Sequence, residues 1–208
     1  MVSQHIRIPH RLVCLTNMPE GIEIETLPLP PSPPGLECQA SARPNCYMRM
    51  WAFSEEARQV LGEKVLSIDL DVLILADMTS FAQGEQFSIV RGISSPYNGS
   101  MWLAFPGRNP EVWADLNSET AGEAQAQKHQ TGRHAGKSYY GSDQSWLSHK
   151  LPGAVTWGND QGVYQYAHIK GRGRLPPACR IILFAGREKP WNASDRIRSM
   201  YKQAVMTR

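Results

Sequence analysis

The chain has 208 residues, a length that suits one domain spanning 1–208 with a core large enough for independent folding. Hydrophobic residues make up 41% and charged residues 20%, and the net charge of +3 fits an anionic ligand without by itself indicating nucleic acid. No stretch reaches the roughly 18 apolar residues of a membrane span, and no signal-peptide core is present. The four cysteines are scattered and form no C-x-x-C pair, which favours a cytoplasmic protein with reduced thiols.

The first half of the chain alternates apolar runs with breaks. Two short strands are expected at 11–17 and 21–29, and the five prolines within 28–34 predict an extended loop after them. Residues 54–63 predict a helix, with Ser54 as its N-cap. The next predicted strands are 65–77, 87–93 and 100–105.

The second half continues this alternation. Helices are expected at 109–116 and 143–151, with a polar insertion at about 117–138 between them. The last predicted strand is 179–186, which runs into a glycine-containing loop. Apolar strands that alternate with short helices predict an α/β domain with a largely parallel sheet.

Two carboxylates interrupt the apolar run VLSIDLDVLILAD at 65–77. Along a strand, Asp69 and Asp71 would point to the same side, roughly 7 Å apart. Because buried unpaired carboxylates are costly, a divalent cation between them would offset their repulsion, and carboxylate oxygens suit Mg²⁺ or Mn²⁺. The alternative is that both lie at a strand end facing water, paired with Lys or Arg.

Two classes of enzyme place a D-x-D after an apolar strand. Dehalogenase-like phosphatases usually have Thr or Val two residues past the second Asp, where this chain has Leu73, and no convincing acidic pair lies downstream. Nucleotide-sugar glycosyltransferases of the type A fold use the D-x-D to hold a metal that bridges the donor diphosphate. Three further segments favour the second class: PYNGSMWLAF (96–105), GSDQSWL (141–147) and LFAGREKPW (183–191).

In order and rough spacing, these segments resemble the asparagine segment, the Asp-Gln segment and the H-F-x-G-x-x-K-P-W signature of glycosyltransferase family 8. RLVCLTNMPEGIEIETLPLP and CYMRMWAF look like parts of related bacterial and phage proteins, so the resemblance covers about residues 10–192. It implies a single-domain, mostly parallel nucleotide-diphospho-sugar transferase fold. The implied reaction moves a sugar, with retention, from a nucleotide-sugar donor, expected to be a UDP-sugar. The acceptor could be a polysaccharide, a lipid, a protein or modified DNA.

The resemblance also implies roles for individual residues. Asp69 and Asp71 would hold the metal, Mn²⁺ or Mg²⁺. Asp143 and Gln144 would line the reactive face of the sugar and stabilise positive charge at its anomeric carbon. The remaining residues would bind the donor together with Asp69: Arg49, Asn98, Gly186 and Lys189.

Simpler interpretations exist for several of these residues. Asn98-Gly99 could form only a turn, Asp143 could merely cap a helix, and Arg49 could be a surface cation. A second group of basic residues could approach an anionic ligand, although a solvated basic face is the simpler interpretation. This group contains Arg172, Arg174, Arg180 and Arg187.

The chain departs from the family pattern in two places. The family's metal-binding His falls at Leu183, or near Ala185, and neither can ligate; His168 is a weak substitute. The family's first strand has no counterpart before Arg11, so we expect an open sheet edge beside 65–71. These departures keep an alternative function open, that of a non-catalytic relative that binds a glycan or a protein.

Overall fold

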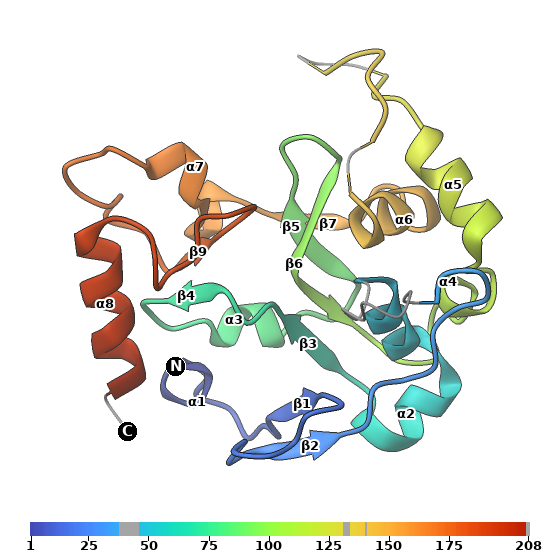
Figure 1. The fold of residues 1–208 in the computed structure, drawn as a ribbon, viewed down its shortest axis with the longest axis horizontal. Helices are drawn as coiled ribbons and strands as arrows, with labels where there is room; N and C mark the ends of the chain where they lie inside the picture. The colour runs from blue at the N-terminus through green and yellow to red at the C-terminus, as the bar shows by residue number, and fades with distance from the viewer. Residues whose placement is uncertain (38–45, 131–133, 140, 207–208) are drawn as a thin grey trace.

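The protein is described here by a computed structural model that covers residues 1–37, 46–130, 134–139 and 141–206. These residues form a mixed α/β fold with three small sheets, and the sheet of the first two strands lies at the lower edge of the view in Figure 1. The strands are β1 (Val13–Leu15), β2 (Glu25–Leu27), β3 (Val65–Ile68), β4 (Val72–Ile74), β5 (Ser88–Arg91), β6 (Tyr97–Ala104), β7 (Val155–Trp157), β8 (Val163–Gln165) and β9 (Ile181–Leu183). The helices are α1 (Val2–His5), α2 (Glu55–Leu61), α3 (Thr79–Ala82), α4 (Glu111–Ala114), α5 (Ser118–Ala126), α6 (Asp143–Lys150), α7 (Tyr166–Ile169) and α8 (Asp195–Met206), with 3₁₀ helices η1 (Cys46–Phe53) and η2 (Asn159–Gln161).

The sheets combine parallel and antiparallel pairs. β1 and β2 form a parallel pair, a four-stranded sheet has the order β3-β6-β5-β7, and a three-stranded sheet has the order β4-β9-β8. Among the described residues, three strand pairings are parallel and three are antiparallel. The α/β class is therefore confirmed, but the expected largely parallel sheet is mixed, because β6 runs antiparallel to both of its neighbours.

The apolar run at 65–77 folds as two strands, whereas the sequence predicts one. β3 ends at Ile68 and pairs with β6, while β4 begins at Val72 and pairs with β9 in another sheet. Leu70 and Asp71 form a turn between them, and Leu70 is 87% exposed. The chain turns where the carboxylates occur because a buried strand does not tolerate unpaired charges. Asp69 and Asp71 therefore do not lie along one strand, so the expectation that they point to the same side of a strand is wrong.

The open edge expected beside 65–71 is present at β3. This strand ends the order of its sheet, so in the described part of the chain it pairs with β6 alone. Its four residues are only half-buried. The segment that begins at α1 packs nearby, because Met78 donates its backbone N–H to the His5 carbonyl at 2.8 Å and Ile6 shares an apolar cluster with β4.

The core consists of three apolar clusters. The first joins η1, β6 and α6 through side chains that include Phe53, Trp102 and Trp146. The second joins β4, β6 and β9, and the third joins α7, β9 and α8, where Ile197 is buried. Full burial of such a side chain stabilises the fold by about 1.5–3 kcal/mol. Contacts between side chains and backbone place η1, the end of β3, the first half of β6 and the start of α6 beside one another.

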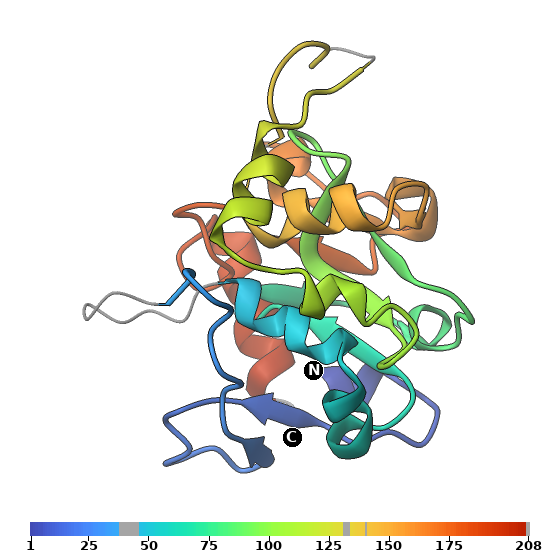
Figure 2. The same ribbon diagram turned by 90° about the vertical axis from the view of Figure 1, so that its right-hand side faces the viewer.

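The predicted polar insertion at about 117–138 begins as a packed helix. Asn117 caps α5 by accepting backbone N–H bonds, and Ala121 and Ala124 are buried against the first cluster. After α5 the chain passes through a bridge between Lys128 and Ser138, in a segment that projects from the body of the molecule (Figure 2). No helix in the described ranges is long and apolar enough to cross a bilayer. The described cysteines, Cys14, Cys46 and Cys179, are free.

Candidate functional site

Arg49 of η1 bridges two carboxylates that are far apart in the sequence. Its Nη1 lies 2.7 Å from Asp69 Oδ1 and its Nη2 lies 2.6 Å from Asp143 Oδ2. Only 21% of the Arg49 side chain and 7% of the Asp143 side chain are exposed. η1 holds the guanidinium in place because its neighbours Met50 and Phe53 are buried in the first cluster. The interpretation of Arg49 as a surface cation is therefore wrong.

The electrostatics of this bridge keep Arg49 charged. Burial alone would lower the pKa of Arg49, but the carboxylates of Asp143 and Asp69 outweigh it and hold that pKa above its ordinary value. Burial raises the pKa of Asp69, and the opposing effect of Arg49 does not fully cancel it. Arg49 Nε is buried without a hydrogen-bond partner among the described residues, whereas Asp143 Oδ2 is satisfied by its ion pair with Arg49 Nη2. Unpartnered buried polar atoms are few in native proteins, and this one lies within a largely buried ionic cluster, which makes the cluster a candidate functional site.

A second ion pair lies beside the first. Asp71 Oδ2 contacts Nζ of Lys189, which the loop after β9 supplies from 118 residues further along the chain. The two side chains are 16% and 28% exposed, respectively. The D-x-D and the G-x-x-K-P-W motif therefore meet in space. Both aspartates contact a basic side chain, as the alternative interpretation of the D-x-D proposes, but these pairs are largely buried rather than open to water.

An irregularity in β6 makes room for Asp143. Ile89 of β5 lies opposite Trp102 and the next residue, Val90, lies opposite Asn98, so residues 99–101 bulge out of register. A Cβ atom added at Gly99 would overlap Asp143 Oδ2 and lie 3.2 Å from Arg49 Nη2. Bulges often occur beside functional sites, where they redirect the chain. Asn98-Gly99 is thus part of a strand rather than a hairpin turn, and the Asn98 side chain accepts the backbone N–H of Ser100 at 2.8 Å.

The start of α6 supplies Asp143 and Gln144. Ser142 occupies the N-cap position, so Asp143 does not cap the helix and instead points toward Arg49. The Gln144 side chain folds over Gly141, where an added Cβ atom would overlap it. Gln144 thus lies next to Asp143 in the chain, but it is not one of the groups that Arg49 binds.

The loop after β9 contains the other predicted donor residue, Gly186. Gly186 has a φ of 68°, a left-handed conformation that favours glycine, and it turns the exposed loop toward Lys189. Leu183, at the position of the family's His, is buried in β9 opposite Val72. His168 is exposed on α7. In the described ranges no group of three or more His, Cys, Asp or Glu side chains could hold a metal ion.

The charges of the site indicate what kind of metal site the residues can form. Three carboxylates (Asp69, Asp71 and Asp143) face two cations (Arg49 and Lys189), which leaves one net negative charge. A diphosphate would be repelled unless further positive charge accompanied it. Mg²⁺ commonly uses one or two carboxylates and takes its other ligands from substrate phosphates and water. Asp69 and Asp71 are carboxylates of the kind that such a cation uses, and in this structure they are paired with Arg49 and Lys189.

Sequence reasoning missed two residues at the site. Gly99 was noticed only as half of a possible turn, although its lack of a side chain is what lets Asp143 and Arg49 approach the strand. Cys46 is exposed at the start of η1 but lies near Arg49 and Asp143, where partial desolvation and the Asp143 carboxylate raise the pKa of its thiol. Nothing in the sequence distinguishes Cys46 from the other scattered cysteines, whereas the N-G pair before a strand was a usable signal for Gly99.

Comparisons with known proteins find similarity among solved structures. No family model matches this chain, and no curated protein matches it. Among solved structures, the chain is similar to the galactosyltransferase LgtC in complex with donor and acceptor sugar analogues, with 15% sequence identity and a TM-score of 0.43. The match covers 69% of this chain and 60% of the LgtC chain, so it spans less than two thirds of that chain.

Proposed function

We propose that this protein is a glycosyltransferase that takes a sugar from a nucleoside diphosphate sugar, with UDP as the nucleotide. The observation that carries the proposal is the convergence of Arg49, Asp69, Asp71, Asp143 and Lys189 at one site. All five lie in segments whose sequences resemble the motifs of glycosyltransferase family 8 and its relatives. Residues from four distant segments would not be expected to form one half-buried ionic network if the motif matches were accidental.

Lys189 and Asp71 would bind the donor diphosphate. In the free protein they neutralise each other across the D-x-D turn. When the donor binds, Asp69 and Asp71 would hold Mg²⁺ or Mn²⁺ against the diphosphate, and Lys189 would turn from Asp71 to a phosphate oxygen. The metal would supply positive charge that stabilises the leaving diphosphate. Gly186 would allow the loop backbone to approach the phosphates closely.

Asp143 would act on the sugar, and Arg49 would position it. The Asp143 carboxylate is held by Arg49 at the start of α6, where it would face the sugar and stabilise positive charge at the anomeric carbon. Gln144 and Asn98 would offer amide groups to the sugar hydroxyls. In a front-face path the leaving phosphate would take the proton of the acceptor hydroxyl as the acceptor oxygen bonds to the anomeric carbon. That path retains configuration and requires no covalent nucleophile.

The test is release of UDP from a panel of UDP-sugars in the presence of Mn²⁺. We expect the unaltered protein to release UDP and Asp143→Asn to lose that release while binding UDP with similar affinity. Asn has the shape of Asp without its charge, so this variant separates the catalytic role from binding. Equal UDP release by the two proteins would contradict the role of Asp143.

A second function is favoured by one observation. Leu183, at the position of the family's metal ligand, is buried in the core and cannot turn toward the D-x-D. A protein that binds a glycan or another protein without turnover would need no metal ligand there. Tight binding on a glycan array, combined with no release of UDP from any UDP-sugar, would support this function over glycosyl transfer.

A further inference from the structure

Positive charge is concentrated in the last part of the chain. Residues 161–208 contain ten Arg and Lys residues but only Glu188 and Asp195 as acids, a net charge of +8. The remaining residues, 1–160, contain twelve Arg and Lys residues and seventeen Asp and Glu residues, a net charge of −5. The small overall net charge of +3 is thus the sum of a strongly basic C-terminal part and an acidic remainder. Charge segregated in this way produces a field that attracts polyanions.

This basic segment occupies one side of the fold. α7, β9 and α8 lie together on the left in Figure 1 and share the third apolar cluster. The loop after α7 is tied to α8, because Arg196 Nη1 donates to the Gly173 carbonyl at 2.6 Å. Lys170 of the same loop pairs with Glu188 at 2.6 Å, next to Lys189 of the candidate site. These contacts bring the loop after α7 next to α8 and next to the loop that carries Lys189.

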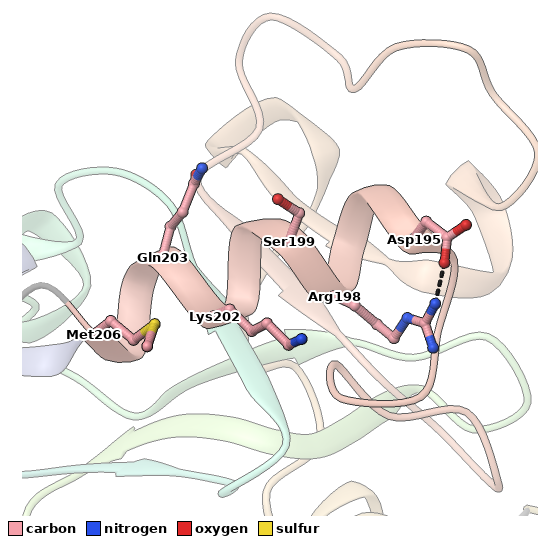
Figure 3. A pocket seen from close by; sticks show the side chains of 6 residues that line it. All are labelled: Asp195, Arg198, Ser199, Lys202, Gln203 and Met206. Atoms are coloured by element: carbon pink, nitrogen blue, oxygen red, sulfur yellow. Dashed lines mark hydrogen bonds and ion pairs between the residues drawn. The ribbon is translucent and has the colours of Figure 1, made fainter.

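Most of this charge is available to a partner. Arg172, Arg174, Arg187 and Lys202 are exposed, and none of them pairs with a carboxylate among the described residues. α8 also lines a surface pocket of about 650 Å³, shown in Figure 3. Its lining side chains project from one side of the helix, with Arg198 paired to Asp195 and Lys202 free of any carboxylate. No residue of the candidate site lines this pocket.

The form of the surface favours a nucleic acid over a bilayer. An amphipathic helix that lies on a membrane needs an apolar face free to enter it. In α8 that face, with Ile197, Met200 and Tyr201, is packed on the protein core. The exposed side chains of α8 include Arg196, Arg198 and Lys202, beside Val205 and Met206 at its end. Arginine supplies most of the charge of this surface, and its planar guanidinium matches phosphate in a two-point contact.

We infer that this basic surface, defined by Arg172, Arg174, Arg187, Arg196, Arg198 and Lys202, binds the phosphodiester backbone of a nucleic acid. The inference does not rest on glycosyl transfer, because it concerns charge outside the candidate site. Contacts to phosphates position a nucleic acid without reading its bases, so binding is expected to depend weakly on sequence and strongly on salt.

Fluorescence anisotropy with a labelled DNA duplex tests the inference in the full chain. The variant Arg172→Gln/Arg174→Gln/Lys202→Gln removes three exposed charges that lack carboxylate partners. If each contacts a phosphate, the slope of log affinity against log salt becomes shallower by about 3. The matched control Lys64→Gln/Lys128→Gln/Lys137→Gln removes three exposed charges from other elements, and we expect it to keep the original slope. Melting temperatures of all three proteins show whether each remains folded.

Three outcomes would overturn the inference. The first is that the duplex does not bind to the unaltered protein. The second is that the control variant loses as much affinity as the test variant, which would mean that net charge and not this surface is responsible. The third is that the protein binds vesicles of phosphatidylserine and phosphatidylcholine but not DNA, which would make the surface a membrane contact.

Discussion

At Arg49, one side chain neutralises two carboxylates that come from different elements. The substitution Arg49→Met should leave Asp69 and Asp143 without a counter-charge in a largely buried position. Loss of one partner from a buried ion pair costs about 3 kcal/mol or more. Urea denaturation should therefore show a large fall in the free energy of unfolding.

Arg58 provides the matched control for Arg49. It also lies between two carboxylates, Glu55 at 3.4 Å and Glu63 at 3.1 Å, but on the surface. Exposed ion pairs contribute little because water and salt screen them, so Arg58→Met should change the free energy of unfolding little. Similar losses for the two variants would mean that the Arg49 bridge is not a buried network.

At Gly99, the absence of a side chain sets the position of the bridge. Gly99→Ala should weaken UDP binding, because the new methyl group would overlap Asp143 Oδ2 and push Asp143 away from Arg49. Isothermal titration calorimetry with UDP measures this effect. The control is Gly122→Ala in α5, where an added Cβ atom meets nothing within 4 Å. Because Ala favours a helix over Gly by about 1 kcal/mol, the control should bind UDP normally and be at least as stable.

The two aspartates Asp69 and Asp77 should titrate in a predictable order. Burial raises the pKa of Asp69, whereas hydrogen bonds from Thr79 lower the pKa of exposed Asp77. Because the pKa of Asp69 is raised by folding, its contribution to stability is present below its ordinary pKa and is lost as the pH rises through the raised value. Because the pKa of Asp77 is lowered by folding, its contribution is present above its ordinary pKa and is lost as the pH falls through the lowered value. Carboxyl NMR titration of the free protein should show Asp69 protonating at the higher pH. The reverse order would contradict the buried bridge.

Among the elements, the loop between β9 and α8 is expected to serve both binding and stability. Lys189→Ala leaves Asp71 unpaired where the two side chains are only 28% and 16% exposed, so the free energy of unfolding should fall by more than the about 0.5 kcal/mol of a surface change. We also expect the fraction of the variant that stays folded to bind UDP much more weakly than the unaltered protein. Lys170→Ala is the control, because Lys170 pairs with Glu188 of the same loop but not with either D-x-D aspartate. If UDP binds normally to folded Lys189→Ala, the role of Lys189 is structural.

The predicted elements succeed or fail for physical reasons. α2 and its cap Ser54 follow from local signals, because the cap accepts the backbone N–H of Ala57 within one turn. The break between β3 and β4 does not, because apolar composition cannot show that β4 leaves one sheet and joins another. The short strands β7 and β8 also escape prediction, since their pairing with β5 and β9 depends on contacts distant in the sequence.

In the site, as in the fold, sequence motifs predict which residues matter, but not which residues contact one another. Motif order identified Asp69, Asp71, Asp143 and Lys189 as functional candidates. It could not show that Arg49 would join Asp69 to Asp143, because a bridge of this kind depends on how η1 and α6 pack. Nor could it show that Lys189 would neutralise Asp71 in the free protein.

At the scale of the whole molecule, charge is divided between an ionic site and a basic side. The site has one net negative charge, so it should favour a diphosphate accompanied by a divalent cation. Binding of DNA to the basic side needs no divalent cation, and its affinity should depend on salt concentration alone. Metal dependence of nucleotide binding and salt dependence of DNA binding should therefore vary independently among variants of the two regions.

The thermal shift produced by UDP, in Mn²⁺ and in EDTA, tests the central claim most directly. A ligand that binds the folded state raises its melting temperature, so binding is read as stabilisation. The account predicts a larger shift with Mn²⁺ than with EDTA for the unaltered protein, and no such difference for Asp71→Asn. Equal shifts in Mn²⁺ and EDTA for the unaltered protein, or no shift in either, would contradict the assignment of Asp69 and Asp71 to a metal-assisted diphosphate site.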